Sequence, residues 1–153
     1  MPTKVYNMSY TLLETVNYVI SQTGAAPVDD INDPLPDVAS AILRIKEAQI
    51  QTLKRGWWFN TDYNVEIAKN GSDSYPIPAE TIKILRASPY FVIERSGLAY
   101  DPYSQTSVFP DGPENLCVSI VYNMPYEDLP YSAQDVVRLI AARTHILIEL
   151  EDD

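Results

Sequence analysis

Residues 53–60, Leu-Lys-Arg-Gly-Trp-Trp-Phe-Asn, mark the point where this chain changes from a helical to a strand-like pattern. Lys54 and Arg55 suit a helix C-terminus, where the helix dipole is negative, and Gly56 can adopt the left-handed conformation that closes a last turn. The stretch therefore predicts a helix end followed at once by an aromatic corner, Trp57 to Phe59. Such a corner either fills the core between the helices and the next part of the chain or anchors another subunit.

Two helical patterns precede this stretch. Thr11 and Glu14 have the spacing of a capping box, and apolar residues then recur at helical intervals until Gly24. After a loop rich in aspartate and proline, Asp37 can cap a second helix that runs to about Arg55. The apolar stripe expected for the second helix is Val38, Ala41, Ile42, Ile45, Ala48 and Leu53, and its mostly wetted positions are Arg44, Lys46, Glu47, Gln49 and Gln51.

After Asn60 the apolar period becomes two residues, which predicts β-strands. Asn70-Gly71 has the composition of a tight hairpin turn, and Arg95-Ser96-Gly97 has that of a second one. A run of proline and glycine at 110–113 interrupts the chain before the last strand. The strand candidates are 63–68, 81–86, 90–94, 98–100 and 116–122. We therefore expect an antiparallel sheet in the middle of the chain.

A third amphipathic helix is predicted after Pro130. Its stripe consists of Val136, Leu139, Ile140, Arg143, Ile146, Leu147 and Leu150. The apolar character continues through Ile146 and Leu150 almost to the last residue, and an apolar stripe at the end of a sequence often docks on another surface. Ile146 and Leu150 are therefore candidate interface residues.

These patterns predict an α+β fold: a bundle of about three helices, with an antiparallel β-sheet inserted between helices two and three. We expect a single domain over residues 1–153, with a helical part at 9–56 and 130–151 and a β part at 60–125. The apolar content of 46% is that of a globular chain. The sequence shows neither a signal-peptide pattern nor an apolar run of membrane-spanning length, so we expect a soluble protein with no membrane partner.

The chain is strongly acidic, with 21 acidic against 11 basic residues and a formal net charge of -10. A surface that binds nucleic acid tightly is normally basic, because it must replace the counterions of the phosphates. Tight DNA binding is therefore not expected. Two interpretations of the acidity remain open: simple solubility, or a surface past which a polyanion moves without binding.

Residues able to carry catalysis are few and scattered. His145 falls within the apolar turn of the third helix, which favours a core or interface histidine over a general base. Glu127 and Asp128 are adjacent, so on a regular element their side chains diverge. Cys117 lies in an apolar run and is expected to be a small buried residue. We expect neither an enzyme nor a bound cofactor.

The acidic loop carries Asp29, Asp30 and Asp33, whose carboxylates are of the type that binds Ca²⁺. Their spacing departs from that of an EF-hand loop, and no glutamate follows at the twelfth position. We therefore expect a solvated acidic loop and no metal site.

The run Arg55-Gly56-Trp57-Trp58-Phe59-Asn60 follows a helix-loop-helix pattern that has Gly24-Ala25-Ala26-Pro27-Val28 in its loop. This arrangement resembles the tail tubular protein A family, the head-to-tail adaptors of short-tailed bacteriophages. In that family an arginine-glycine-tryptophan-any-phenylalanine-asparagine run ends the second helix. Every fixed position of the family run is matched, and Trp58 occupies the free position.

Three later segments are similar to the same family. The run from Tyr100 to Phe109 resembles the family's tyrosine-aspartate loop, and the run from Tyr126 to Pro130 resembles the acidic, apolar and proline segment before its last helix. Ala141-Ala142-Arg143 is similar to its alanine-rich helix. Family members usually continue beyond the third helix into a charged helical segment, whereas this sequence ends at Asp153.

The resemblance implies a structural protein of the virion, assembled in the host cytoplasm and located at the head-tail junction. It implies a homo-oligomeric ring, a dodecamer by family analogy, that docks beneath the portal protein and receives the tail nozzle, tubular protein B. DNA would pass through the ring without specific binding.

A closed ring needs two different patches that meet on neighbouring copies. The candidates are the aromatic corner, with Arg55, Trp57, Trp58 and Phe59, and the tyrosine loop, with Tyr100 and Tyr103. We expect Trp57 and Phe59 to lock the helical part to the sheet, which leaves Trp58 as the better candidate for a contact with a neighbour. Asp29, Asp30 and Asp33 are candidates for the lining of the DNA passage. The alternative function is an acidic α+β protein-binding module that recruits a partner through its tyrosine loops.

Overall fold

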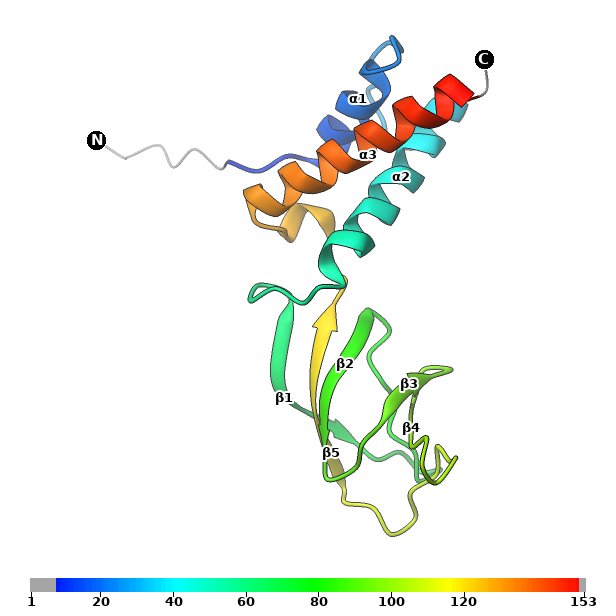
Figure 1. Cartoon of the computed structure of the whole chain (residues 1–153), viewed down its shortest axis with the longest axis vertical. Helices are drawn as coiled ribbons and strands as arrows, with labels where there is room; N and C mark the ends of the chain where they lie inside the picture. The colour runs from blue at the N-terminus through cyan, green and yellow to red at the C-terminus, as the bar shows by residue number, and fades with distance from the viewer. Residues whose placement is uncertain (1–7, 152–153) are drawn as a thin grey trace, which may run out of the picture. The chain divides into compact units, whose positions relative to one another are not determined.

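The computed structural model describes residues 8–151, and these fall into two compact units. Among these residues, the helical unit comprises 8–52 and 125–151, and the β unit comprises Leu53–Met124. Within the described residues, three α-helices are present and antiparallel strands lie between the second and third of them, which confirms the α+β class (Figure 1). The assignment of residues 1–153 to a single domain stays a prediction.

The helical unit contains α1 (Leu12–Ser21), α2 (Pro36–Leu53), a 3₁₀ turn η1 (Tyr126–Asp128) and α3 (Tyr131–Glu151). The predicted capping box begins α1: Thr11 Oγ1 accepts from the Glu14 amide at 3.1 Å, and Glu14 Oε2 accepts from the Thr11 amide at 2.7 Å. Helix α1 packs along α3 (Figure 1). Its buried residues are Thr15, Val16, Val19 and Ile20.

Helix α2 differs from the prediction in two details. It begins at Pro36, so Asp37 lies in the first turn and is not the cap. A proline suits a first turn because its missing amide would have no helical partner. Gln49, expected to be wetted, is buried, because it follows Ile45 by four residues and shares its face. Of the predicted stripe, Ile42 is half-buried and the other five residues are buried, as expected: Val38, Ala41, Ile45, Ala48 and Leu53.

Helix α3 buries a different side from the stripe that the sequence indicated. Its buried residues are Ala133, Gln134, Val137, Ala141, Ala142 and His145. The exposed residues include four members of the predicted stripe, Val136, Leu139, Leu147 and Leu150. The physical reason is that α3 is apolar on nearly every side, so its periodicity cannot say which apolar side faces inward.

The β unit contains a three-stranded antiparallel sheet and a small two-stranded sheet (Figure 1). The larger sheet has the order β1 (Thr61–Ala68), β5 (Asn115–Tyr122), β2 (Thr81–Ser88). Ile67 pairs with Leu116 on one side of β5, and Ile84 pairs with Ile120 on the other. The smaller sheet pairs β3 (Ile93–Arg95) with β4 (Leu98–Tyr100) across the predicted Arg95-Ser96-Gly97 turn.

Asn70-Gly71 does not join neighbouring strands, which corrects the hairpin prediction, because β1 and β2 both pair with β5. The Asn70 side chain instead holds a local turn, where its Oδ1 accepts from the amides of Ser72 at 2.9 Å and Ser74 at 3.0 Å. Tyr75 follows this turn and lies in the core, before β2 begins. The predicted strand at 90–94 is also wrong in its bounds, since β3 starts only at Ile93.

Tyr75 is the largest fully buried side chain of the β unit. Its hydroxyl donates to the Pro113 carbonyl, and its ring lies 5.3 Å from that of Phe109. Burial raises the pKa of Tyr75 above the usual phenol range, which keeps this donor protonated. Gly112 is required beside it, because an added Cβ would lie 2.6 Å from Tyr75 Oη and 3.0 Å from Phe109 Cβ.

No helix within residues 8–151 combines the length and the apolar character that crossing a membrane requires.

Candidate functional site

The aromatic corner is built on a turn that Asn60 holds. Gly56 has φ of +80°, and its amide donates to the Leu53 carbonyl at 3.0 Å, so it closes the end of α2 as predicted. Asn60 Oδ1 accepts from the Trp57 amide at 2.7 Å. Asn60 Nδ2 donates to the carbonyls of Leu53 at 3.1 Å and Tyr122 at 2.9 Å. The buried side chain of Asn60 thus joins the turn to the end of β5.

The aromatic side chains of this turn differ in their exposure to solvent. The rings of Trp57 and Phe59 stack with centroids 6.3 Å apart, and the Arg55 guanidinium lies 5.3 Å from the centre of the Trp57 ring. Trp58 meets Phe59 edge-on at 5.6 Å and is 82% exposed, against 37% for Trp57. Trp58 is therefore the side chain that the corner directs to solvent. That Trp57 and Phe59 lock helices to sheet stays a prediction.

The tyrosine loop is ordered by the carboxylate of Asp101. Its Oδ1 accepts from the amides of Tyr103 at 2.8 Å and Ser104 at 3.2 Å, and Asp101 and Thr106 exchange backbone hydrogen bonds. The hydrogen bond from the Ser104 amide, supported by that from Tyr103, holds the pKa of Asp101 below its usual range. The charged form, and with it the turn, therefore persists at any pH above the ordinary aspartate pKa.

Of the two candidate tyrosines of this loop, Tyr103 is exposed and Tyr100 is not. Tyr103 is 84% exposed and meets Phe91 edge to face at 5.7 Å. Phe91 is itself exposed, although the sequence pattern places it within a strand. Tyr100 is half-buried, and the Arg95 guanidinium lies 3.6 Å from the centre of its ring. The structure therefore brings Phe91 and Tyr103 together as an exposed aromatic pair.

The two candidate interface residues at the end of α3 differ in their exposure to solvent. Leu150 is exposed, and Ile146 is half-buried. Leu150 lies on the same outer side of the helix as Leu139 and Leu147, since these positions recur at helical spacing. This outer side is an apolar surface on the helical unit.

The acidic loop forms a series of local turns. Asp30 Oδ1 accepts from the backbone and side-chain amides of Asn32, both at 2.9 Å, and Asp33 Oδ1 accepts from the Leu35 amide at 3.1 Å. Asp29 and Asp30 are exposed, and Asp33 is half-buried. Over residues 8–151, no three side chains of metal-binding type converge here or elsewhere. The loop presents negative charge to solvent.

His145 is fully buried in the helical unit, as a core histidine would be. Its Nε2 lies 3.4 Å from Thr23 Oγ1, and its Nδ1 has no hydrogen-bond partner among the described residues. No carboxylate hydrogen-bonds to this imidazole in the part of the chain that the structure covers, so the arrangement lacks the orienting partner that a catalytic histidine usually has.

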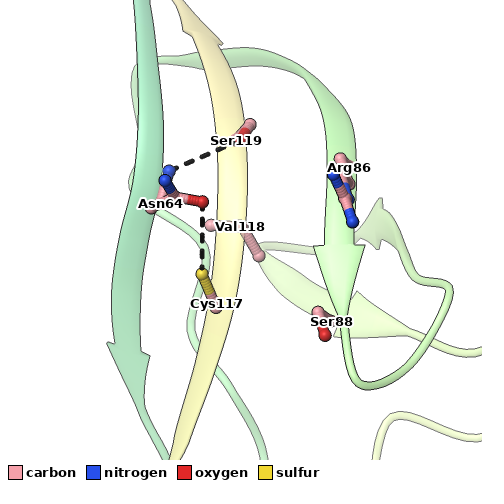
Figure 2. Close-up of a pocket in the computed structure, with 6 residues that line it drawn as sticks. All are labelled: Asn64, Arg86, Ser88, Cys117, Val118 and Ser119. Atoms are coloured by element: carbon pink, nitrogen blue, oxygen red, sulfur yellow. Dashed lines mark hydrogen bonds between the residues drawn. The ribbon is translucent and has the colours of Figure 1, made fainter.

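Cys117 is half-buried, which corrects the expectation of a buried residue. Leu116, Val118 and Ile120 point into the core, so the intervening Cys117 and Ser119 lie on the other face of β5. There they border a hollow of about 240 Å³ (Figure 2). Its lining consists of Asn64, Arg86, Ser88, Cys117, Val118 and Ser119.

Figure 2 shows Asn64 reaching across to β5 from β1. The Cys117 thiol lies 3.8 Å from the side-chain oxygen Oδ1 of Asn64. The backbone amide of Asn64 donates to Ser119 Oγ at 3.4 Å. The lining of the hollow contains polar side chains and the basic residue Arg86. It contains neither a carboxylate nor an imidazole. It therefore has no acid-base pair of the kind used in hydrolysis.

Most of the described residues of both units lie within a region that matches a known family. A protein-family model described as "Tail tubular protein" matches residues 13–147, which include all of α2, the β unit and most of α1 and α3. Comparison with curated protein sequences finds no match. The chain belongs to the tail tubular protein family, and is thus a structural component of a bacteriophage tail, present in the virion with other virion proteins.

Proposed function

We propose that this protein is a head-to-tail adaptor, whose copies form a ring between the portal and the tail nozzle. A ring of twelve copies follows from analogy with the adaptors that the sequence resembles. The observation that carries the proposal is the Arg55–Asn60 turn, which lies inside the region matched by the family and presents Trp58 to solvent on a fixed backbone. A rigid, exposed aromatic side chain is the kind of residue that dominates protein interfaces.

The exposed surfaces suit assembly with more than one partner. Trp58 and the Phe91–Tyr103 pair are separate aromatic features of the β unit, and the outer side of α3 is an apolar feature of the helical unit. A protein between two different partners, and between two neighbours in a ring, needs several such patches. This supports an adaptor better than a module with one binding loop.

Sedimentation with purified portal rings from the same phage tests the proposal. We expect the chain to co-sediment with the portal in several copies per ring. Trp58→Ala should reduce the bound fraction several-fold and leave the free energy of unfolding within about 0.5 kcal/mol of wild type, because the side chain is exposed. Tyr63→Ala, which removes another exposed aromatic of the β unit, is the matched control and should bind normally.

A chain that never associates with the portal would contradict the adaptor role and favour the protein-binding module. If Trp58→Ala and Tyr63→Ala bound equally well, Trp58 would not be part of the contact.

We also propose that Asp29, Asp30 and Asp33 line the DNA passage. Their charge, in a chain with a net charge of -10, would repel the phosphates, so that DNA slides past the wall. Replacing all three by asparagine should slow genome ejection and leave particle assembly intact. Ejection at the wild-type rate from normally assembled particles would contradict this role.

A further inference from the structure

The hollow of Figure 2, which we call the recess, is lined from β2 by Arg86 and Ser88. Arg86 pairs with Ser119 and Ser88 pairs with Cys117, so these side chains share one face of the sheet. The register shifts just before Arg86, where Leu85 is an extra residue. Without this bulge Leu85 would oppose Ser119, and Arg86 would point to the core. The bulge therefore directs Arg86 to the recess.

Strand β1 carries a second bulge at the same level of the sheet. The register of β1 against β5 shifts between Asp62 and Val65. Tyr63 and Asn64 therefore oppose a single residue, Ser119. Asn64 has φ of +56°, a left-handed conformation that asparagine tolerates better than most residues, and its amide donates to Ser119 Oγ at 3.4 Å. Bulges often lie beside functional sites, where they re-aim side chains, and here two of them flank one residue of the central strand.

The donors of the recess have no acceptor on the protein. Over residues 8–151, Arg86 forms no ion pair, and neither its guanidinium nor the Ser88 hydroxyl donates a hydrogen bond. Ser119 Oγ accepts from the Asn64 amide, so its own proton is left for another acceptor. Glu66 of β1 lies on the same face but outside the lining, and no ion pair joins it to Arg86 in the part of the chain that the structure describes.

A guanidinium beside two hydroxyls suits a carboxylate. Two N–H groups of a guanidinium match the two oxygens of a carboxylate, and the hydroxyls of Ser88 and Ser119 can donate to the lone pairs that remain. A nucleic-acid backbone fits this surface less well, because the chain has a net charge of -10 and the recess is lined by only one basic residue, Arg86. The recess therefore has the chemistry to hold one carboxylate.

The recess adjoins the turn that carries Trp58. A Cβ added at Gly56 would lie 3.1 Å from Val121 Cγ2, so this turn rests on Val121. Val121 and Ser119 are two residues apart on β5, which places them on the same face at a spacing of about 7 Å. The Trp58 turn and the recess are therefore neighbours on one face of the β unit.

We propose that the recess binds the carboxylate of an aspartate or glutamate side chain of the partner that covers Trp58. This rests on the proposed function, in which that partner is the portal. Arg86 pairs with the two carboxylate oxygens, and Ser88 and Ser119 donate to them. The recess thus adds a requirement for an acidic side chain to the aromatic contact.

Alkylation of Cys117 reports whether the recess is occupied, because this residue lines the recess and is the only cysteine of the sequence. The neutral reagent N-ethylmaleimide is applied to the chain alone, in sodium acetate or in sodium chloride of the same ionic strength. We expect acetate to slow alkylation in a saturable way, by about five-fold at high concentration, since bound acetate covers the thiol. The Asn64 amide resonance should shift over the same acetate range, because its acceptor Ser119 Oγ then donates to the ligand.

Two variants make the acetate series specific. Arg86→Gln should abolish the protection and the shift, and should leave alkylation in chloride unchanged, since the side chain is exposed. Lys83→Gln removes another exposed base of β2, outside the lining, and is the matched control that should keep the protection. Absence of protection in the wild-type chain, or equal protection in Arg86→Gln, overturns the carboxylate site.

The same alkylation on the chain bound to portal rings tests the source of the carboxylate. We expect Cys117 of the bound chain to react at least five-fold more slowly than in the free chain, and Arg86→Gln to lower the bound fraction several-fold. Bound chain that reacts at the free rate, or normal binding of Arg86→Gln, overturns the portal carboxylate and leaves the adaptor role standing. Absence of portal binding contradicts the adaptor role and this assignment of the partner, whereas the acetate series tests the recess by itself.

Discussion

Asn60→Ala is expected to lower the free energy of unfolding of the β unit by about 3 kcal/mol. The Asn60 side chain is buried, and its three hydrogen bonds satisfy the Trp57 amide and the carbonyls of Leu53 and Tyr122. Alanine removes all three hydrogen bonds, although the Leu53 carbonyl keeps the Gly56 amide as a donor. A buried polar group that loses its partner costs more than the net value of the bond. Urea unfolding followed by tryptophan fluorescence measures the effect, since both tryptophans lie in this turn.

Two further variants make this experiment specific. Asn60→Asp keeps the shape and the acceptor but replaces the donor to two carbonyls by a carboxylate, so it should be destabilised at least as much. Asn115→Ala removes an exposed asparagine at the start of β5 and should change the free energy by less than about 0.5 kcal/mol. A loss for Asn60→Ala no larger than that of Asn115→Ala would show that Asn60 does not hold the turn.

Gln134→Ala is expected to destabilise the helical unit by a similar amount, about 3 kcal/mol. Gln134 is fully buried. Its Oε1 accepts from the Tyr10 amide at 2.9 Å, and its Nε2 donates to the carbonyls of Tyr10 at 3.1 Å and Tyr126 at 3.0 Å. The side chain thus fastens the segment before α1 and the 3₁₀ turn to the beginning of α3. Removing it also leaves a cavity, which adds to the loss.

Urea unfolding followed by helical circular dichroism measures the stability of this variant, and hydrogen exchange at the Tyr10 amide reports the local contact. We expect faster exchange at Tyr10 under conditions where the unit is still folded. Gln51→Ala, at an exposed position of α2, is the control and should behave like wild type. Unchanged Tyr10 exchange in Gln134→Ala would mean that other contacts suffice to hold this segment.

Local signals predicted the start of α1 and the end of α2. Thr11 and Glu14 form the capping box, and Gly56 closes α2 with a positive φ. These features are local because each depends on hydrogen bonds between residues close in sequence. The same is true of the Arg95-Ser96-Gly97 turn between β3 and β4.

Features that depend on distant contacts were not predictable from the sequence. The place of β5 between β1 and β2 joins residues far apart in the chain, and the turn signal at Asn70-Gly71 says nothing about which strands pair. The buried side of α3 is set by its contact with α1, since the helix is apolar on nearly all sides. For these reasons the predicted hairpin and the predicted α3 stripe were wrong.

The candidate surfaces were predictable only in part. Trp58 and Tyr103 were selected from the sequence, and the structure exposes both, while their role as contacts stays a prediction. Phe91 was missed because it was assigned to a strand, and Leu43 was missed because it stands among buried apolar neighbours of α2. Only the fold shows which of several adjacent apolar side chains is exposed.

Locating the chain in the virion tests the adaptor role most directly. Particles of the phage that encodes it, carrying an epitope tag on this protein, can be labelled with gold and imaged by electron microscopy. The adaptor role predicts label confined to the junction of head and tail, and particles that lack the protein should carry no tail. Label elsewhere on the tail, with portal and nozzle joined in the protein's absence, would contradict it.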